Sequence, residues 1–247
     1  MDDLESLEEI PLDLISLSTM TSPIHSSQEK TIDQIEDVLD LFNHYYTNDS
    51  EKSLVLPIAN IRIPPRSKFL MSDLNYLKPL LRFKYALIVM DPPWINHSVA
   101  RSQHYPMLDC YELFKLPVAS WLQPHGLVCI WVTNHPKYHE FIKQKLLKAY
   151  QCELVGCWKW TKCLNASGET RQSNPKHRQP FEKVYIARKR SSTHHEDLKD
   201  FPKDFEIRAM PGIHSQKPRL EAYLKPFVPK GEYLELFSRQ LISGYTS

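Results

Sequence analysis

Glycine is scarce in this chain of 247 residues, which contains only six. They stand at positions 126, 156, 168, 212, 231 and 244, and none belongs to a G-x-G-x-x-G or G-x-x-x-x-G-K pattern. The sequence therefore excludes the glycine-rich turn of dinucleotide-binding proteins and the P-loop that cradles phosphates. A nucleoside that binds to this chain must be held without a glycine-rich loop.

The chain also lacks the sequence features of metal, membrane and secreted proteins. Its five cysteines form no C-x-x-C pair, which is typical of free thiols in a reducing compartment. His135 and His139 are four residues apart, a spacing that suits a metal, but no third ligand is evident, so we predict no metal site. No apolar run approaches the ~18 residues of a membrane span. The acidic start predicts neither a secretory signal nor a transit peptide.

Charge is divided unevenly along the chain. Residues 1–60 hold 13 acidic residues against two lysines, whereas the rest holds 29 basic and 16 acidic residues. A basic body suits an anionic partner such as nucleic acid, and an ordinary solvated surface is the alternative. The length suits one domain with a sizeable core and an appendage. We therefore divide the chain into an acidic extension, residues 1–52, and a main domain, residues 53–247.

The extension carries two patterns. Residues 1–25 are acidic and rich in Ser and Thr, which is typical of a disordered segment or of an arm that binds a protein partner. Ser26 and Glu29 suit a capping box. Apolar side chains then recur at helical spacing between residues 28 and 46, and they predict one amphipathic helix: Ile32, Ile35, Leu39, Phe42 and Tyr46.

The most informative stretch of the main domain is Asp91-Pro92-Pro93-Trp94. It follows an apolar run over residues 85–90, which predicts a strand buried on both faces. The prolines end that strand and hold Asp91 at its carboxyl end, where open α/β sheets bind ligands. A carboxylate, the carbonyls of a stiff turn and a flat indole together suit a planar amine. The alternative is an ordinary Asp-capped turn with Trp94 packed in a core.

Further elements alternate along the main domain. Residues 127–134, 153–162, 181–188 and 232–237 predict strands, and residues 136–150 and 219–225 predict helices. This alternation indicates a mainly parallel, doubly wound α/β sheet, with antiparallel pairs where the connecting helices are short. Trp158 and Trp160, at period two, favour the core over a nucleic-acid groove.

The basic residues between these elements are candidates for nucleic-acid contact. The polar loop over residues 163–180 contributes Arg171, Lys176 and Arg178. The segment at residues 188–190, Arg-Lys-Arg, is a candidate phosphate contact or nuclear signal.

With these motifs assembled, the chain resembles the DPPW adenine-N6 methyltransferase family over about residues 53–245. The resemblance rests on Asp91-Pro92-Pro93-Trp94 and on the segments at 131–134, 215–218 and 235–239. The methyltransferase-like protein four branch is the most similar, from residues 63–70, Arg101-Ser102, 214–218 and 231–237. The resemblance implies a Rossmann-like methyltransferase fold dependent on S-adenosylmethionine, with a permuted motif order.

The resemblance also implies roles for individual residues. Asp91, Pro92, Pro93 and Trp94 would be catalytic, with Asp91 and the following carbonyls binding the target amine and Trp94 stacking on the base. Residues expected to contact the cofactor are Asp73 and Leu74 at its adenine, Lys217 at its carboxylate or the reacting region, and Glu235 and Arg239 at its ribose. Residues expected to contact the substrate are Tyr105, Arg101 and Glu182.

Three functions compete under this resemblance. The first is adenosine N6-methylation of RNA, with small nuclear RNA at a 2′-O-methylated adenosine implied by the branch. The second is the same reaction on DNA, and the third is a non-catalytic nucleic-acid-binding relative. The expected location is the nucleus, alone or together with the cytoplasm.

Two departures from the family bear on the cofactor. Ser238 stands where the family usually has Gly. The chain also stops at Ser247, before a Gly-Asn loop that contacts cofactor in the family. Either the chain is a short version of the family, or it lacks part of the cofactor pocket, and the departure bears on cofactor affinity rather than on the fold.

Overall fold

The computed structural model describes residues 29–32, 35–56, 61–95, 108–165, 167–170, 179–190, 198–212 and 216–247. The chain divides into two compact units, which are considered separately: residues 1–84 with 232–247, and residues 85–231. The predicted boundary after residue 52 lies within the first unit and stays a prediction.

The first unit is built on a mixed sheet with the strand order β1-β2-β5-β12-β11. Its strands are β1 (Glu29–Thr31), β2 (Tyr45–Asn48), β5 (Ser67–Leu70), β12 (Tyr245–Thr246) and β11 (Glu232–Leu236). The neighbours β5, β12 and β11 run parallel, whereas β2 and β5 pair antiparallel. The parallel set therefore brings the carboxyl ends of β5 and β11 to one edge.

Shorter elements complete this unit. They are η2 (Val38–Leu41), η3 (Lys78–Arg82) and a two-stranded antiparallel sheet of β3 (Leu54–Leu56) and β4 (Ile61–Ile63). One apolar cluster links η2 and the β3–β4 pair to the main sheet through Leu41, Phe42, Tyr46, Ile63 and Phe69. Burial of this cluster accounts for the close packing of the short elements against the sheet.

The predicted amphipathic helix over residues 28–46 is wrong. Its described residues include β1, the 3₁₀ helix η2 and the start of β2. Asn43 adopts a left-handed backbone, with φ of 62°, which interrupts any helix. The observed capping box uses Asp37 and Asp40 rather than Ser26 and Glu29, because Glu29 lies in β1 and Ser26 lies outside the described residues.

The second unit contains a sheet with the order β6-β7-β9-β8-β10. Its strands are β6 (Tyr85–Met90), β7 (Leu122–Val132), β9 (Phe181–Lys189), β8 (Cys152–Lys162) and β10 (Glu206–Ala209). The pairs β6–β7 and β8–β10 are parallel, and β9 runs antiparallel to both of its neighbours. The predicted α/β fold is thus confirmed, and within the sheet of the second unit the antiparallel pairing is confined to β9.

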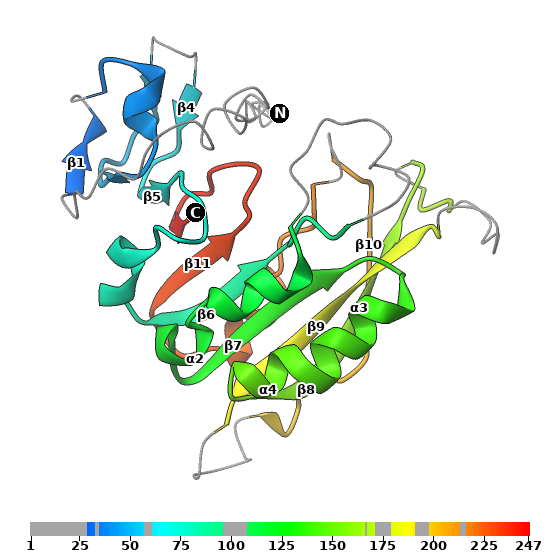
Figure 1. The fold of residues 1–247 in the computed structure, drawn as a ribbon. Coiled ribbons are helices and arrows are strands. Elements are labelled where there is room, and N and C mark those ends of the chain that lie inside the picture. The colour runs from blue at the N-terminus through cyan, green and yellow to red at the C-terminus, as the bar shows by residue number, and fades with distance from the viewer. Residues whose placement is uncertain are drawn as a thin grey trace. The chain divides into compact units, whose positions relative to one another are not determined.

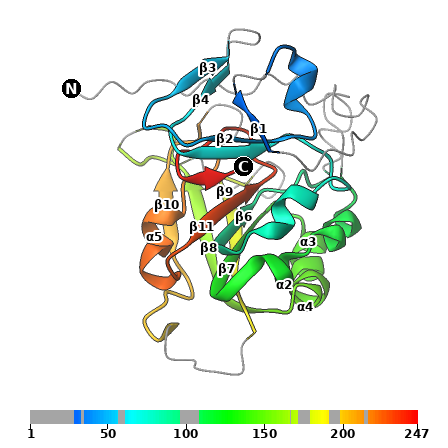
Figure 2. The same cartoon turned by 90° about the vertical axis from the view of Figure 1, so that its left-hand side faces the viewer.

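Helices cover both faces of this sheet. Figure 1 shows α2 (Val118–Trp121), α3 (Pro136–Phe141) and α4 (Leu147–Ala149) on one face, and Figure 2 shows α5 (Glu221–Leu224) on the other. A π turn, η6 (Ile142–Leu146), joins α3 to α4, so the helix predicted from Pro136 runs almost to Tyr150. The 3₁₀ helices η5 (Cys110–Lys115) and η9 (Lys225–Phe227) complete the unit. No helix within the described ranges is long and apolar enough to cross a membrane.

The core of the second unit is rich in tryptophan. Trp131, Trp158 and Trp160 are almost completely buried, and the rings of Trp131 and Trp160 meet edge to face at 6.1 Å. Trp158 stacks on Phe201 at a ring distance of 5.6 Å. The prediction that Trp158 and Trp160 belong to the core is therefore confirmed.

Candidate active site

The Asp91–Trp94 turn is fixed rigidly at the carboxyl end of β6. All six residues of β6 are buried, as the apolar run predicts. The Trp94 backbone N–H donates to the Pro92 carbonyl at 2.7 Å, and its indole N–H donates to the Trp131 carbonyl of β7 at 2.8 Å. The Trp94 ring also lies 4.7 Å from that of Tyr138 in α3. These contacts hold the turn against both a neighbouring strand and a helix.

Trp94 itself is only 8% exposed. Its indole N–H donates to a backbone carbonyl and its ring packs against Tyr138, both inside the protein. The structure therefore gives Trp94 the role of positioning the turn. The predicted stacking of Trp94 on a target base stays a prediction.

Asp91 belongs to a cluster of alternating charges. The Lys217 ammonium lies 2.8 Å from Asp91 Oδ2 and 3.2 Å from Glu182 Oε2. The other Glu182 oxygen, Oε1, forms an ion pair with the Lys162 ammonium. The four side chains are between 13% and 24% exposed, so solvent screens their interactions only partly. Two carboxylates and two ammonium groups thus neutralise one another beside the acidic turn.

The pKa of Glu182 reflects this arrangement. Burial alone would raise the pKa of this carboxyl group, but the charges and hydrogen bonds of Lys217 and Lys162 outweigh it. The net result is a pKa below the ordinary value for glutamate, so Glu182 is a carboxylate at neutral pH. The structure therefore brings Asp91, Lys217 and Glu182 together as three of the predicted site residues. The role of Lys217, at the cofactor's carboxylate or in the reacting region, stays a prediction.

The remaining predicted cofactor residues lie in the first unit, at the carboxyl edge of its parallel strands. Asp73 and Leu74 follow β5, and Arg239 follows β11. Asp73 is exposed, and its Oδ1 accepts the Asn75 backbone N–H at 2.6 Å. Glu235 is half-buried within β11, with one carboxylate oxygen shielded from solvent.

These residues fit a nucleoside cofactor without phosphates. Carboxylates accept hydrogen bonds from a ribose diol or an adenine amine, and such a ligand needs no glycine-rich loop. Ser238 is also compatible with its turn. The residue with the left-handed backbone is Phe237, with φ of 60°, and not Ser238. Because only the left-handed region favours glycine strongly, serine is accommodated here.

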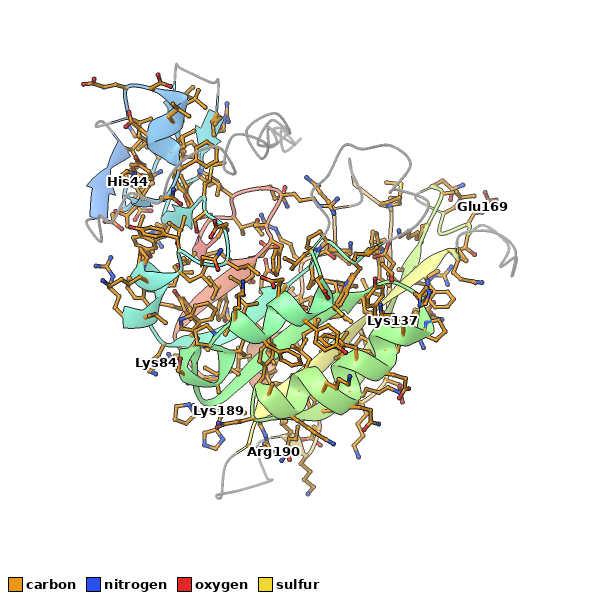
Figure 3. All side chains as sticks on the ribbon, viewed as in Figure 1. His44, Lys84, Lys137, Glu169, Lys189 and Arg190 are labelled. Carbon is orange, nitrogen blue, oxygen red and sulfur yellow. The ribbon has the colours of Figure 1, made fainter. Side chains whose placement is uncertain are left out.

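Some predicted residues cannot be placed. Arg101 and Tyr105 lie outside the described residues, as do Arg171, Lys176 and Arg178. The segment at residues 188–190 is described, and Arg190 is its exposed residue, so a phosphate contact there stays a prediction. Arg188 is buried and paired with Glu153, and the Lys189 ammonium donates to the Leu122 carbonyl at 3.2 Å. Figure 3 places Lys189 and Arg190 at the end of the sheet opposite Lys137.

The two histidines that suggested a metal pair have other partners. His135 caps α3, where its side chain accepts the Lys137 backbone N–H. His139 Nδ1 lies 3.0 Å from the Tyr185 hydroxyl. Among the described residues, no group of three or more His, Cys, Asp or Glu side chains could hold a metal ion.

Lys162 is the site residue that sequence reasoning missed. It is the last residue of β8, and Glu182 lies opposite Trp160 in the β8–β9 ladder. Residues two apart on a strand share a face, so Lys162 is the diagonal neighbour of Glu182. The signal was a pair of opposite charges at the ends of two apolar strands, but it is readable only once the register is known.

The α/β fold and the family match given next define a class, the Rossmann-like fold of S-adenosylmethionine-dependent methyltransferases. A family model described as MT-A70 matches residues 85–247, and the chain belongs to this family. The family expected from the sequence motifs is therefore confirmed, and relatives named METTL4 agree with the expected branch.

Individual relatives agree with this assignment. The human N(6)-adenine-specific methyltransferase METTL4 is 33% identical, over 96% of this chain and 55% of its own length. The N6-methyladenosine RNA methyltransferase MTA1 of Pyricularia oryzae is 30% identical, over 74% of this chain and 51% of its own. A DNA N6-methyl methyltransferase of Caenorhabditis elegans is 33% identical, over 73% of this chain and 50% of its own length. The chain thus spans about half the length of these relatives.

Proposed function

We propose that this protein is an adenine-N6 methyltransferase, which transfers a methyl group from S-adenosylmethionine to the exocyclic amine of adenosine in nucleic acid. The observation that carries the proposal is the position of Asp91. It stands on a rigid turn at the carboxyl end of β6, and the Lys217 ammonium engages one of its oxygens. The names of the three relatives support the same chemistry.

The site would act by orienting a poor nucleophile. The lone pair of an adenine amine is delocalised into the ring, so the amine must be aimed at the methyl group. Asp91 and the Pro92 carbonyl would accept its two hydrogens and stabilise the positive charge that develops on nitrogen. The Pro92 carbonyl already accepts the Trp94 N–H, but a carbonyl oxygen has two lone pairs. Alignment of the reacting atoms supplies much of the remaining rate enhancement.

S-adenosylmethionine would supply the electrophilic methyl group. Asp73 and Leu74 would hold its adenine, and Glu235 and Arg239 its ribose. None of these residues takes part in bond making. Their role is to fix the cofactor while Asp91 fixes the amine.

The finer proposal is an RNA substrate, namely small nuclear RNA at a 2′-O-methylated adenosine, in the nucleus or in nucleus and cytoplasm. DNA is the second candidate, because one relative is named for DNA. In either case the target base must be unpaired or flipped out, since a base inside a duplex cannot reach such a turn. The acidic residues 1–25 would recruit a protein partner.

The test is methyl transfer by the purified protein. Labelled S-adenosylmethionine is incubated with RNA and DNA oligonucleotides of matched sequence, and with RNA that carries a 2′-O-methyl group at the target. We expect label in RNA, and most in the 2′-O-methylated RNA. Preferential labelling of DNA would favour the second candidate. Oligonucleotide binding without any labelling would identify a non-catalytic relative instead.

A variant pair assigns the reaction to the site. Asp91→Ala should lose at least about 100-fold in turnover while it stays folded. Asp204→Ala is the matched control, because Asp204 is an exposed aspartate of the same unit. Normal turnover by purified Asp91→Ala would show that the mechanism is wrong.

A further inference from the structure

Lys162 is held in one place by two neighbours. Its ammonium pairs with Glu182 Oε1 and lies 4.9 Å from the centre of the Trp160 ring. Trp160 is fully buried, and its indole N–H donates to the Ala209 carbonyl at 3.1 Å, so the ring is itself fixed. A lysine packed on a rigid ring loses little further entropy on pairing, which makes the pair with Glu182 more favourable than a surface pair.

Lys217 faces two competing carboxylates. Its ammonium is 2.8 Å from Asp91 and 3.2 Å from Glu182, so both carboxylates share a single positive charge. The charged groups that face Glu182 within the described residues are Lys162 from β8 and Lys217 from the segment before α5. Without Lys162, Lys217 would be the one cation left on Glu182 among the described residues, and Glu182 would draw it away from Asp91.

We propose that Lys162 is a positioning residue of the methyl-transfer site: it neutralises Glu182 and thereby keeps Lys217 on Asp91. This inference rests on the proposed function. Lys162 itself touches neither substrate nor cofactor in this mechanism. It acts through Glu182 and Lys217 on the orientation of the Asp91 carboxylate, which must accept the hydrogens of the target amine.

The experiment compares Lys162→Met, Lys162→Arg and Glu182→Gln with the double variant Lys162→Met/Glu182→Gln. Lys159→Met is the matched control, because Lys159 lies on the same strand but pairs with Glu206 instead. Steady-state methyl transfer gives kcat and KM for each variant across a range of pH. A ¹³C NMR titration of the Glu182 carboxyl group provides a readout that does not need turnover.

We expect Lys162→Met to lower kcat by about 10- to 100-fold with little change in KM. The reason is that a displaced Asp91 carboxylate would misalign the target amine without weakening substrate binding. Lys162→Arg should restore most of kcat. In Lys162→Met the pKa of Glu182 rises, and a protonated Glu182 no longer draws Lys217 away from Asp91, so the deficit in kcat should shrink as pH falls through that raised pKa. In the Glu182→Gln background, Lys162→Met should have no further effect on kcat, because Lys162 acts only through the charge of Glu182.

Distinct results overturn the two proposals. If the wild-type protein transfers methyl groups but Lys162→Met behaves like Lys159→Met, the role of Lys162 is refuted and the function stands. Additive losses in the double variant, or an unmoved Glu182 titration, refute it as well. If the wild-type protein labels no oligonucleotide, the proposed function fails, and the role of Lys162 fails with it.

Discussion

Replacement of Lys217 by methionine tests the charge cluster most directly. The variant keeps the length of the side chain but leaves Asp91 and Glu182 without the cation that lies between them. Loss of one partner from a fully buried ion pair costs roughly 3–5 kcal/mol. The exposures here are 13% for Lys217, 19% for Asp91 and 18% for Glu182, and water at the site reduces that cost. We therefore expect the free energy of unfolding to fall by about 2–4 kcal/mol at pH 7.

The loss should depend on pH in a defined direction. In the wild-type protein the pKa of Glu182 is lowered, so its stabilisation is present at neutral pH and is lost as pH falls through that lowered pKa. In Lys217→Met the pKa of Glu182 rises, because burial and the Asp91 carboxylate raise this pKa and only Lys162 still lowers it. The variant thus lacks this stabilisation at neutral pH, while at low pH both proteins carry a protonated Glu182. The difference in stability should shrink between about pH 7 and pH 4.

Urea unfolding at several pH values measures both quantities. Lys143→Met is the control, because Lys143 pairs with Glu140 at 2.9 Å on an exposed surface and should contribute less than about 1 kcal/mol. Equal losses for the two variants would refute the reasoning. So would a loss at Lys217 that stays constant from neutral to acidic pH.

Two further variants test other parts of the fold. Trp94→Phe keeps the ring beside Tyr138 but removes the donor to the Trp131 carbonyl, so stability should fall by about 1–3 kcal/mol in urea unfolding; an unchanged midpoint would contradict the positioning role of Trp94. Asn48 is 2% exposed, and its amide donates to the Pro64 carbonyl at 2.7 Å and to two further carbonyls. Asn48→Asp should therefore cost about 2–4 kcal/mol, and thermal unfolding should show a loss that eases at acidic pH; a loss that grows on acidification would count against this explanation.

The sequence predicts best where one physical constraint dominates. The strand β6 is apolar on both faces, which only a buried strand of that length satisfies, and Pro92 must end it. Pro136 begins the helix over β7 because its missing N–H needs no partner at that position. Trp158 and Trp160 are two residues apart on one strand, so a single buried face accommodates both. Each of these predictions needs only neighbouring residues.

The error at residues 28–46 has the opposite cause. The apolar spacing there matches a helix, but Tyr45, Tyr46 and Thr47 have side chains that favour strands, and β5 offers them an antiparallel partner. Tyr46 then stacks on Phe69 at a ring distance of 5.1 Å. Tertiary pairing with a distant strand outweighed a local helical period, which the extension alone could not reveal.

The charge cluster shows why the catalytic motif is not a complete description of its own site. Asp91 is 126 positions from Lys217 in sequence, and the two meet only because the segment before α5 returns to the end of β6. Lys217 in turn depends on Glu182, and Glu182 on Lys162, through a register that β8 and β9 establish between their buried faces. A mutation at either strand end can therefore change the behaviour of Asp91 without touching the motif. In relatives that keep Asp91-Pro92-Pro93-Trp94, the charge at the position of Lys162 should accordingly be a better guide to turnover than the motif alone.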